Sequence, residues 1–145
     1  MLQENLAKVQ AKVQEALANR KEKKATGDKV TILAVTKNHP PEIVTEALAA
    51  GLTDVGENRV QEAMHKQEVL PPGGVWHLIG HLQTNKAKHA VEHLPSLNRW
   101  TAKRLCSIWI RKQAALGKVQ DVLLQINEAG EEQKSGFAPE EFRAV

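Results

Sequence analysis

Two hydrophobic patterns alternate along the chain. Between Leu2 and Leu17 apolar residues recur every three to four positions among Lys, Gln and Glu, which predicts an amphipathic helix over about residues 2–19. Residues 30–36 form a nearly continuous apolar, β-branched run, typical of a strand covered on both faces. The chain therefore opens with a helix and then enters a buried strand.

Turn residues and helix-stop residues divide the rest of the chain into further elements. A turn is expected at Gly27-Asp28, and a helix is expected between the Pro40-Pro41 pair and Gly51. The remaining pattern predicts helices over residues 60–69, 84–93 and 101–116, and strands over 53–55, 75–79 and 119–126, with a weaker strand pattern at 94–97.

Strands thus alternate with helices of about ten residues. This order favours an α/β fold with a parallel sheet and right-handed crossovers. In such folds ligands bind beyond the carboxyl ends of the strands, so residues that directly follow a strand are the first candidates for a site.

Lys37 directly follows the first strand. Side chains alternate along a strand, so Thr31, Leu33, Val35 and Lys37 are expected to project to one side. If that side is a partly desolvated interior, the amine is a nucleophile toward aldehydes. The alternative is an ordinary strand-end lysine in water, and position alone favours it.

Composition narrows the class of protein. The 145 residues are 41% apolar and 26% charged, as in one globular domain, and the net charge of +3 is spread along the chain. The one dense basic run, residues 20–24, suits a helix C-terminus, so we expect no nucleic-acid binding. We expect no membrane span and no leader, and a single cysteine, Cys106, which we expect in the core, fits the cytoplasm.

Histidine spacing gives little support for a metal. His77 and His81 straddle a strand end, so they do not share a helix face. His89 and His93 have the right helical spacing, but we place Glu92 on a different face. We therefore expect no metal site.

Four segments carry a resemblance to a known family. They are "LAVTKNHPPEIVTEALAAGL" around Lys37, "GENRVQE" at residues 56–62, "HLIGHLQTNK" at 77–86 and "VLLQINEAGEEQKSGF" at 122–137. In order and spacing they resemble the pyridoxal phosphate homeostasis proteins, small single-domain relatives of the alanine racemase N-terminal barrel.

The resemblance implies a TIM-type (β/α)8 barrel that carries pyridoxal 5′-phosphate. The imine-forming lysine of the family falls on Lys37. The resemblance further implies that Asn58 and His77 line the same barrel mouth, that Gly80 allows close backbone approach, and that Lys134 is a secondary contact.

The resemblance implies a cofactor carrier or regulator without an established reaction. Racemisation needs a second acid or base on the opposite face of the cofactor, which the extra domain of the racemases supplies. The alternative is a racemase or decarboxylase that uses the same lysine, Lys37. The chain has no tyrosine to serve as the second group.

The chain departs from the family pattern in two places. It stops at Val145, after about five βα units, so we expect a single barrel domain over residues 1–145 that lacks its C-terminal part. Without the loops after strands seven and eight we expect weak or no cofactor retention. We expect a monomer when the barrel is complete, and association through open strand edges when it is not. The unusual stretch 94–112 has two open explanations, a compensated pair of reading-frame shifts or divergence.

Overall fold

A computed structural model of the chain describes residues 1–21, 29–94, 96–100, 103–119 and 121–141. The strands are β1 (Leu33–Val35), β2 (Asp54–Glu57), β3 (Val75–Leu78), β4 (Ser96–Trp100) and β5 (Asp121–Leu124). The helices are α1 (Leu2–Ala18), α2 (Glu42–Ala49), α3 (Val60–Val69), the 3-10 helix η1 (Thr84–Lys86), α4 (Ala87–His93) and α5 (Lys103–Leu116). The turn predicted at Gly27-Asp28 and part of the basic run 20–24 lie outside the described residues.

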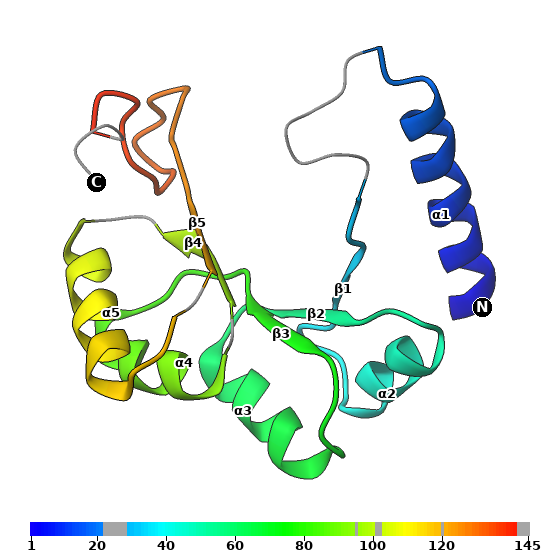
Figure 1. Cartoon of the computed structure of the whole chain (residues 1–145), viewed down its shortest axis with the longest axis horizontal. Helices are drawn as coiled ribbons and strands as arrows, with labels where there is room; N and C mark the ends of the chain where they lie inside the picture. Colours follow the sequence, from blue (N-terminus) through cyan, green and yellow to red (C-terminus); the bar gives the residue numbers. More distant parts are fainter. Residues whose placement is uncertain (22–28, 95, 101–102, 120, 142–145) are drawn as a thin grey trace.

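The five strands form one parallel sheet in the order β1-β2-β3-β4-β5, so each strand pairs with its neighbours in sequence. A helix connects each strand to the next, because parallel neighbours need a crossover. Figure 1 shows α2, α3, α4 and α5 along one side of the strands. The predicted α/β class is confirmed.

The hydrophobic core lies between the sheet and these helices. The strands contribute Val55, Trp76 and Leu78, which are at most 6% exposed. The helices contribute small or β-branched residues that allow close packing, namely Val44, Val60, Ala63, Ala87, Ala90 and Val91. The strand residues of the core occupy alternate positions, as the two-residue period of a strand requires.

The other strand positions face the side of the sheet away from these helices. On that side a Cβ at Gly56 would lie 2.6 Å from Leu33 Cδ2 and 3.2 Å from Ile79 Cδ1. Val35 is 48% exposed there. The prediction that the first strand is covered on both faces is therefore wrong: the helices cover one face only. The strand is also shorter than predicted.

The bounds of the helices agree with the predictions more closely than the burial of individual residues does. The predicted bounds 60–69 coincide with α3, and α2 ends before Gly51 as expected. The predicted helix 84–93 is divided into η1 and α4. In α1, Leu6 is the buried residue while Val9 is 47% exposed, because this helix stands beside the sheet and not against its helical layer (Figure 1).

The unusual stretch 94–112 contributes to the fold. Its first part holds β4, which the weak strand pattern at 94–97 anticipated. Trp109 and Cys106 join the core at 1% and 6% exposure, so the predicted core position of Cys106 is confirmed. Burial raises the pKa of the Cys106 thiol. No described helix is long and apolar enough to cross a bilayer.

We expect the two faces of the sheet to differ sharply in their contribution to stability. Leu78→Ala removes a side chain that is 1% exposed in the core and should lower the free energy of unfolding by about 2–5 kcal/mol. The matched Leu123→Ala, on the open face at 62% exposure, should cost less than about 1 kcal/mol. Urea unfolding of both variants measures this difference, and equal costs would contradict the assignment of the core.

Candidate functional site

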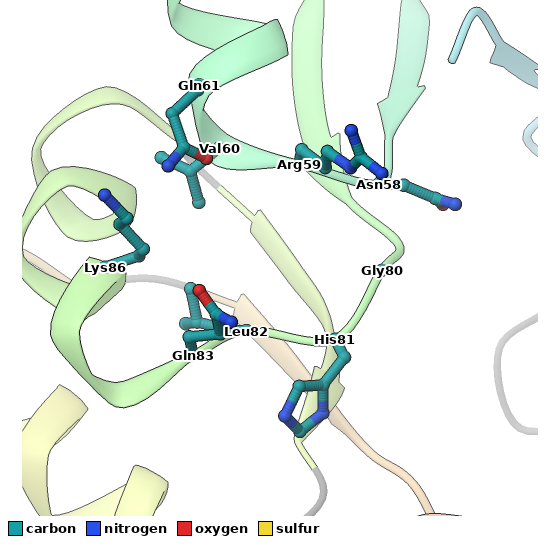
Figure 2. Close-up of a pocket in the computed structure, with 9 residues that line it drawn as sticks. All are labelled: Asn58, Arg59, Val60, Gln61, Gly80, His81, Leu82, Gln83 and Lys86. Atoms are coloured by element: carbon teal, nitrogen blue, oxygen red, sulfur yellow. The ribbon is translucent and has the colours of Figure 1, made fainter. Parts of the chain in front are cut away.

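A cavity lies where β2 and β3 end and the chain turns toward the next helices. It has a volume of about 600 Å³, which is in the range of small-ligand sites. Two segments line it. The first is residues 58–61, at the start of α3, and the second is residues 80–83 with Lys86, which precede α4. Figure 2 shows the first segment along one side of the cavity and the second along the other.

Asn58 and Gly80 join the two sides of the cavity. A Cβ at position 80 would lie 2.1 Å from the backbone oxygen of Asn58, which is closer than real atoms approach. Gly80 is itself buried. Backbone therefore packs directly on backbone here, the kind of close approach that only glycine allows. The structure brings these two predicted site residues together.

The side chains around the cavity are mainly polar or cationic. Arg59 and Lys86 supply positive charge, and Gln61 and Gln83 supply amide groups. The cavity also borders Val60, the first residue of α3, where helix N–H groups favour an anion. Sequence reasoning missed Arg59, Gln61 and Gln83. Their signal was their place in the two motif segments, directly after the strands.

Lys37 does not line this cavity. It directly follows β1, which pairs with β2, and the residues that follow β2 line the cavity from Asn58 onward. The Lys37 side chain is exposed, and its ammonium makes no hydrogen bond or ion pair with the described residues. The amine is therefore accessible from solvent.

His77 is the third of the four residues of β3, one residue before its carboxyl end. Its Nε2 is 2.7 Å from Asp54 Oδ1, and both side chains are 15% exposed. Asp54 is the first residue of β2, so this contact directs the His77 side chain toward the amino end of the strands. The hydrogen bond from Thr53 and the one from His77 together lower the pKa of Asp54 more than burial raises it.

Lys134 has a partner of its own. Its Nζ is 2.8 Å from Glu131 Oε1 in the segment after β5, and the side chain is 61% exposed. β5 and β1 are the two edge strands of the sheet. The structure thus places Lys134 at the opposite end of the strand order from Lys37.

A buried polar cluster that sequence reasoning missed lies directly behind Lys37. Lys66 Nζ donates to Glu57 Oε1 at 2.7 Å and to Glu62 Oε1 at 2.9 Å, and Thr36 Oγ1 donates to Glu57 Oε1 at 2.5 Å. Lys66 and Glu57 are 2% and 0% exposed. The signal was a lysine on the same helical face as Val60 and Ala63, and a glutamate inside a strand.

The structure corrects one part of the metal argument. Ligand atoms of His89, Glu92 and His93 all lie within 4.8 Å of one another, so the prediction that Glu92 sits on a different face is wrong. The reason is that positions three and four apart share one side of a helix. Glu92 also pairs with Lys88 at 3.9 Å, and no described side chain holds either imidazole by a hydrogen bond. Metal sites normally have such supporting contacts.

A cavity at the carboxyl edge of a parallel sheet, lined here by Lys86, is the place where α/β proteins commonly bind ligands. No protein-family model matches the chain. Curated proteins named pyridoxal phosphate homeostasis protein do match: the one from Pseudomonas aeruginosa is 39% identical over 98% of this chain and 61% of its own length. Those from Aquifex aeolicus and Escherichia coli K12 are 35% and 36% identical, over 98% and 92% of this chain and 61% and 57% of their lengths.

Solved structures agree with the sequence matches. PipY of Synechococcus elongatus with pyridoxal phosphate bound is 36% identical, with a TM-score of 0.70 over 91% of this chain and 61% of that one. A protein of unknown function from Bifidobacterium adolescentis reaches a TM-score of 0.79 at 28% identity, over 97% and 59%. A histidine racemase from Leuconostoc mesenteroides, 20% identical with a TM-score of 0.61 over 79% and 31%, shares the fold.

In sequence and in fold the chain is similar to the pyridoxal phosphate homeostasis proteins, as its motifs indicated. The chain spans about three fifths of the length of the curated relatives that it matches.

We expect Gly80→Ala to disturb both sides of the cavity at once. The new methyl group would collide with the backbone of Asn58, which cannot rotate away as a side chain can. The free energy of unfolding should fall by about 1–3 kcal/mol. Gly73→Ala is the matched control, because its Cβ would make an ordinary 3.5 Å contact with Leu48. Urea unfolding measures both, and a neutral Gly80→Ala would contradict the close approach.

We expect Asp54 to titrate below its ordinary range. Because its pKa is lowered in the folded state, the stability that it contributes is present above the ordinary pKa and is lost as pH falls through the folded pKa. Thr53→Val removes the 2.6 Å hydrogen bond to Asp54 Oδ2 and should raise that pKa, whereas Thr45→Val, at an exposed position of α2, should leave it unchanged. Carboxyl-carbon NMR titration of Asp54 follows the change. An unshifted midpoint in the unsubstituted chain would refute the expectation.

Proposed function

We propose that the chain binds pyridoxal 5′-phosphate through Lys37, and that the protein to which it belongs serves cofactor homeostasis. The observation that carries the proposal is the exposed Lys37 side chain directly after the carboxyl end of β1, the strand next to β2, whose own end leads into the cavity. A relative that is 36% identical has been solved with this cofactor bound.

The residues around the cavity fit such a ligand. Pyridoxal phosphate presents an aldehyde, an aromatic ring and a dianionic phosphate, so a site for it needs an amine, room for the ring and positive charge. Lys37 offers the amine, and the cavity is large enough for the ring. Arg59, Lys86 and the N-terminus of α3 offer the positive potential that a phosphate requires.

The covalent step needs only the amine and the aldehyde. With the cofactor bound, the Lys37 nitrogen would be the nucleophile toward the aldehyde carbon, with a C=N bond replacing C=O and the oxygen lost as water together with the two amine protons. No oxidant or reductant takes part. The amine must be unprotonated to attack, and the open face of the sheet gives it access to the ligand.

We infer that the five strands are part of a TIM-type (β/α)8 barrel, with the open face of the sheet as the barrel interior. Two observations support this. The strand order follows the sequence without a reversal, as in a barrel, and the connecting helices α2, α3, α4 and α5 lie along one side. In this arrangement Lys37 would point into the barrel mouth, and His77, with its partner Asp54, would lie deeper in the interior.

Binding without turnover is the function that we propose. The likeness to a histidine racemase, at 20% identity, concerns the fold alone. A racemase or decarboxylase that uses Lys37 stays the alternative, and release of product from amino acids by the loaded chain would favour it. Cytoplasmic location, the absence of nucleic-acid binding and the monomeric state of a complete barrel stay predictions from the sequence.

The proposal is tested by trapping the ligand on the purified chain. We expect an absorbance band of the imine after addition of pyridoxal phosphate, loss of that band on borohydride reduction, and a phosphopyridoxyl group on the peptide that contains Lys37. Lys37→Ala should abolish this product. Peptide mass spectrometry identifies the modified lysine.

Lys29→Ala is the matched control, because Lys29 is an exposed lysine near the amino end of the same strand. It should leave the modification of Lys37 unchanged. Equal labelling of Lys29 and Lys37, or labelling spread over all exposed lysines, would overturn the proposal.

A further inference from the structure

The backbone on both sides of Lys37 is held by one buried polar cluster. Lys66 Nζ donates to the carbonyl oxygen of Thr36 at 2.8 Å, on the amino side of Lys37. Glu62 Oε1 accepts the backbone N–H of Asn38 at 2.7 Å, on the carboxyl side. Lys66 and Glu62 are themselves joined at 2.9 Å. Lys37 therefore sits in a loop whose two ends are tied to the same helix.

The loop that carries Lys37 has an uncommon backbone conformation. The N–H of His39 donates to Thr36 O at 3.1 Å, which closes a four-residue turn with Lys37 and Asn38 at its centre. Asn38 has a φ of +61°, in the left-handed region that few residues other than glycine adopt readily. The hydrogen bond from Asn38 to Glu62 is made in this conformation and so favours it over more extended alternatives.

The cluster is unusual for its place in the fold. Lys66 is 2% exposed on the face of α3 that otherwise packs Val60 and Ala63 into the core. A lysine is rarely buried unless it is paired, and a buried ion pair generally stabilises a fold no better than apolar side chains of similar size. Stability alone thus does not account for Lys66, whereas its contact with the backbone at Lys37 gives it a specific role.

Glu57 anchors the cluster to the sheet. It lies at the end of β2, is fully buried, and accepts from both Lys66 and the Thr36 hydroxyl. Lys66 is held on the other side by Glu62, whose pKa is lowered: burial raises it, but the hydrogen bonds from Lys66 and Asn38 outweigh burial. The cluster thus links β2, α3 and the turn after β1 through charge-assisted hydrogen bonds.

We propose that Lys66, together with Glu57 and Glu62, is a positioning group for Lys37, which fixes the turn at residues 36–39 so that the Lys37 amine is presented in one direction at the mouth of the site. This role rests on the proposed function of Lys37. None of the three residues needs to touch the ligand. They act on the two peptide groups that flank the reacting lysine.

Lys66→Met tests the role directly, with Lys88→Met as the matched control. Lys88 also lies on a helix and pairs with a glutamate four residues away, but it is 63% exposed. In Lys66→Met the rate of pyridoxal phosphate trapping on Lys37 should fall about tenfold or more, because a misplaced reacting group loses much of its effective concentration. Lys88→Met should trap at the unsubstituted rate. A rate in folded Lys66→Met equal to that of Lys88→Met overturns the proposal.

A pair of Glu62 variants keeps the test decisive if Lys66→Met does not fold. Glu62 is 22% exposed, and its loss leaves Lys66 paired with Glu57. In Glu62→Ala hydrogen exchange of the Asn38 amide should become about tenfold faster, as expected for the loss of one hydrogen bond to a charged group, and trapping on Lys37 should slow. Glu62→Gln keeps a side-chain oxygen for the Asn38 N–H and should restore both.

The two readouts separate this inference from the function on which it rests. If the unsubstituted chain gives no product at Lys37, the proposed function fails, and amide exchange alone decides. Faster exchange in Glu62→Ala, restored in Glu62→Gln, supports the fixing of the turn by Glu62, and unchanged exchange overturns it. If the unsubstituted chain traps the ligand but Glu62→Ala traps it equally fast, the positioning role is overturned.

Discussion

Strand pairing in register is the constraint on which the rest of the structure depends. Once Val35 is paired with Gly56 and Gly56 with His77, alternation decides which side chains meet the helices and which face the open side. Thr36 and Glu57 then fall on the helical side and become buried, while Lys37, directly after Thr36 in the turn, is exposed. A shift of one residue would bury the lysine and expose the carboxylate.

The buried ion cluster is the second consequence of this register. Glu57 enters the helical layer because of its strand position, and an unpaired carboxylate there would be costly. Lys66 on α3 meets it at 2.7 Å, and the same ammonium then reaches the backbone at Thr36. One cation thus neutralises a strand residue and orders the loop that carries Lys37. Packing and site geometry are coupled through this one side chain.

The sequence allowed the element order to be predicted because hydrophobic period and turn residues are local signals. It did not allow the burial of β1 or α1 to be predicted, since Val35 and Val9 are exposed by the absence of a packed layer beside them, which no local pattern reports. Asn58 and Gly80 were predicted as site residues from the motifs, but their contact depends on two loops that are separate in sequence. The cluster around Lys66 was missed because a lysine on a helix is normally solvated.

The contact between Gly80 and Asn58 has a mechanical consequence. With no side chain between them, the two loops touch main chain to main chain, and neither can swing without displacing the other. The two backbone segments that line the cavity are therefore coupled at this contact. Any adjustment of the cavity to a guest molecule falls to its long side chains, such as Arg59 and Lys86, and not to its backbone.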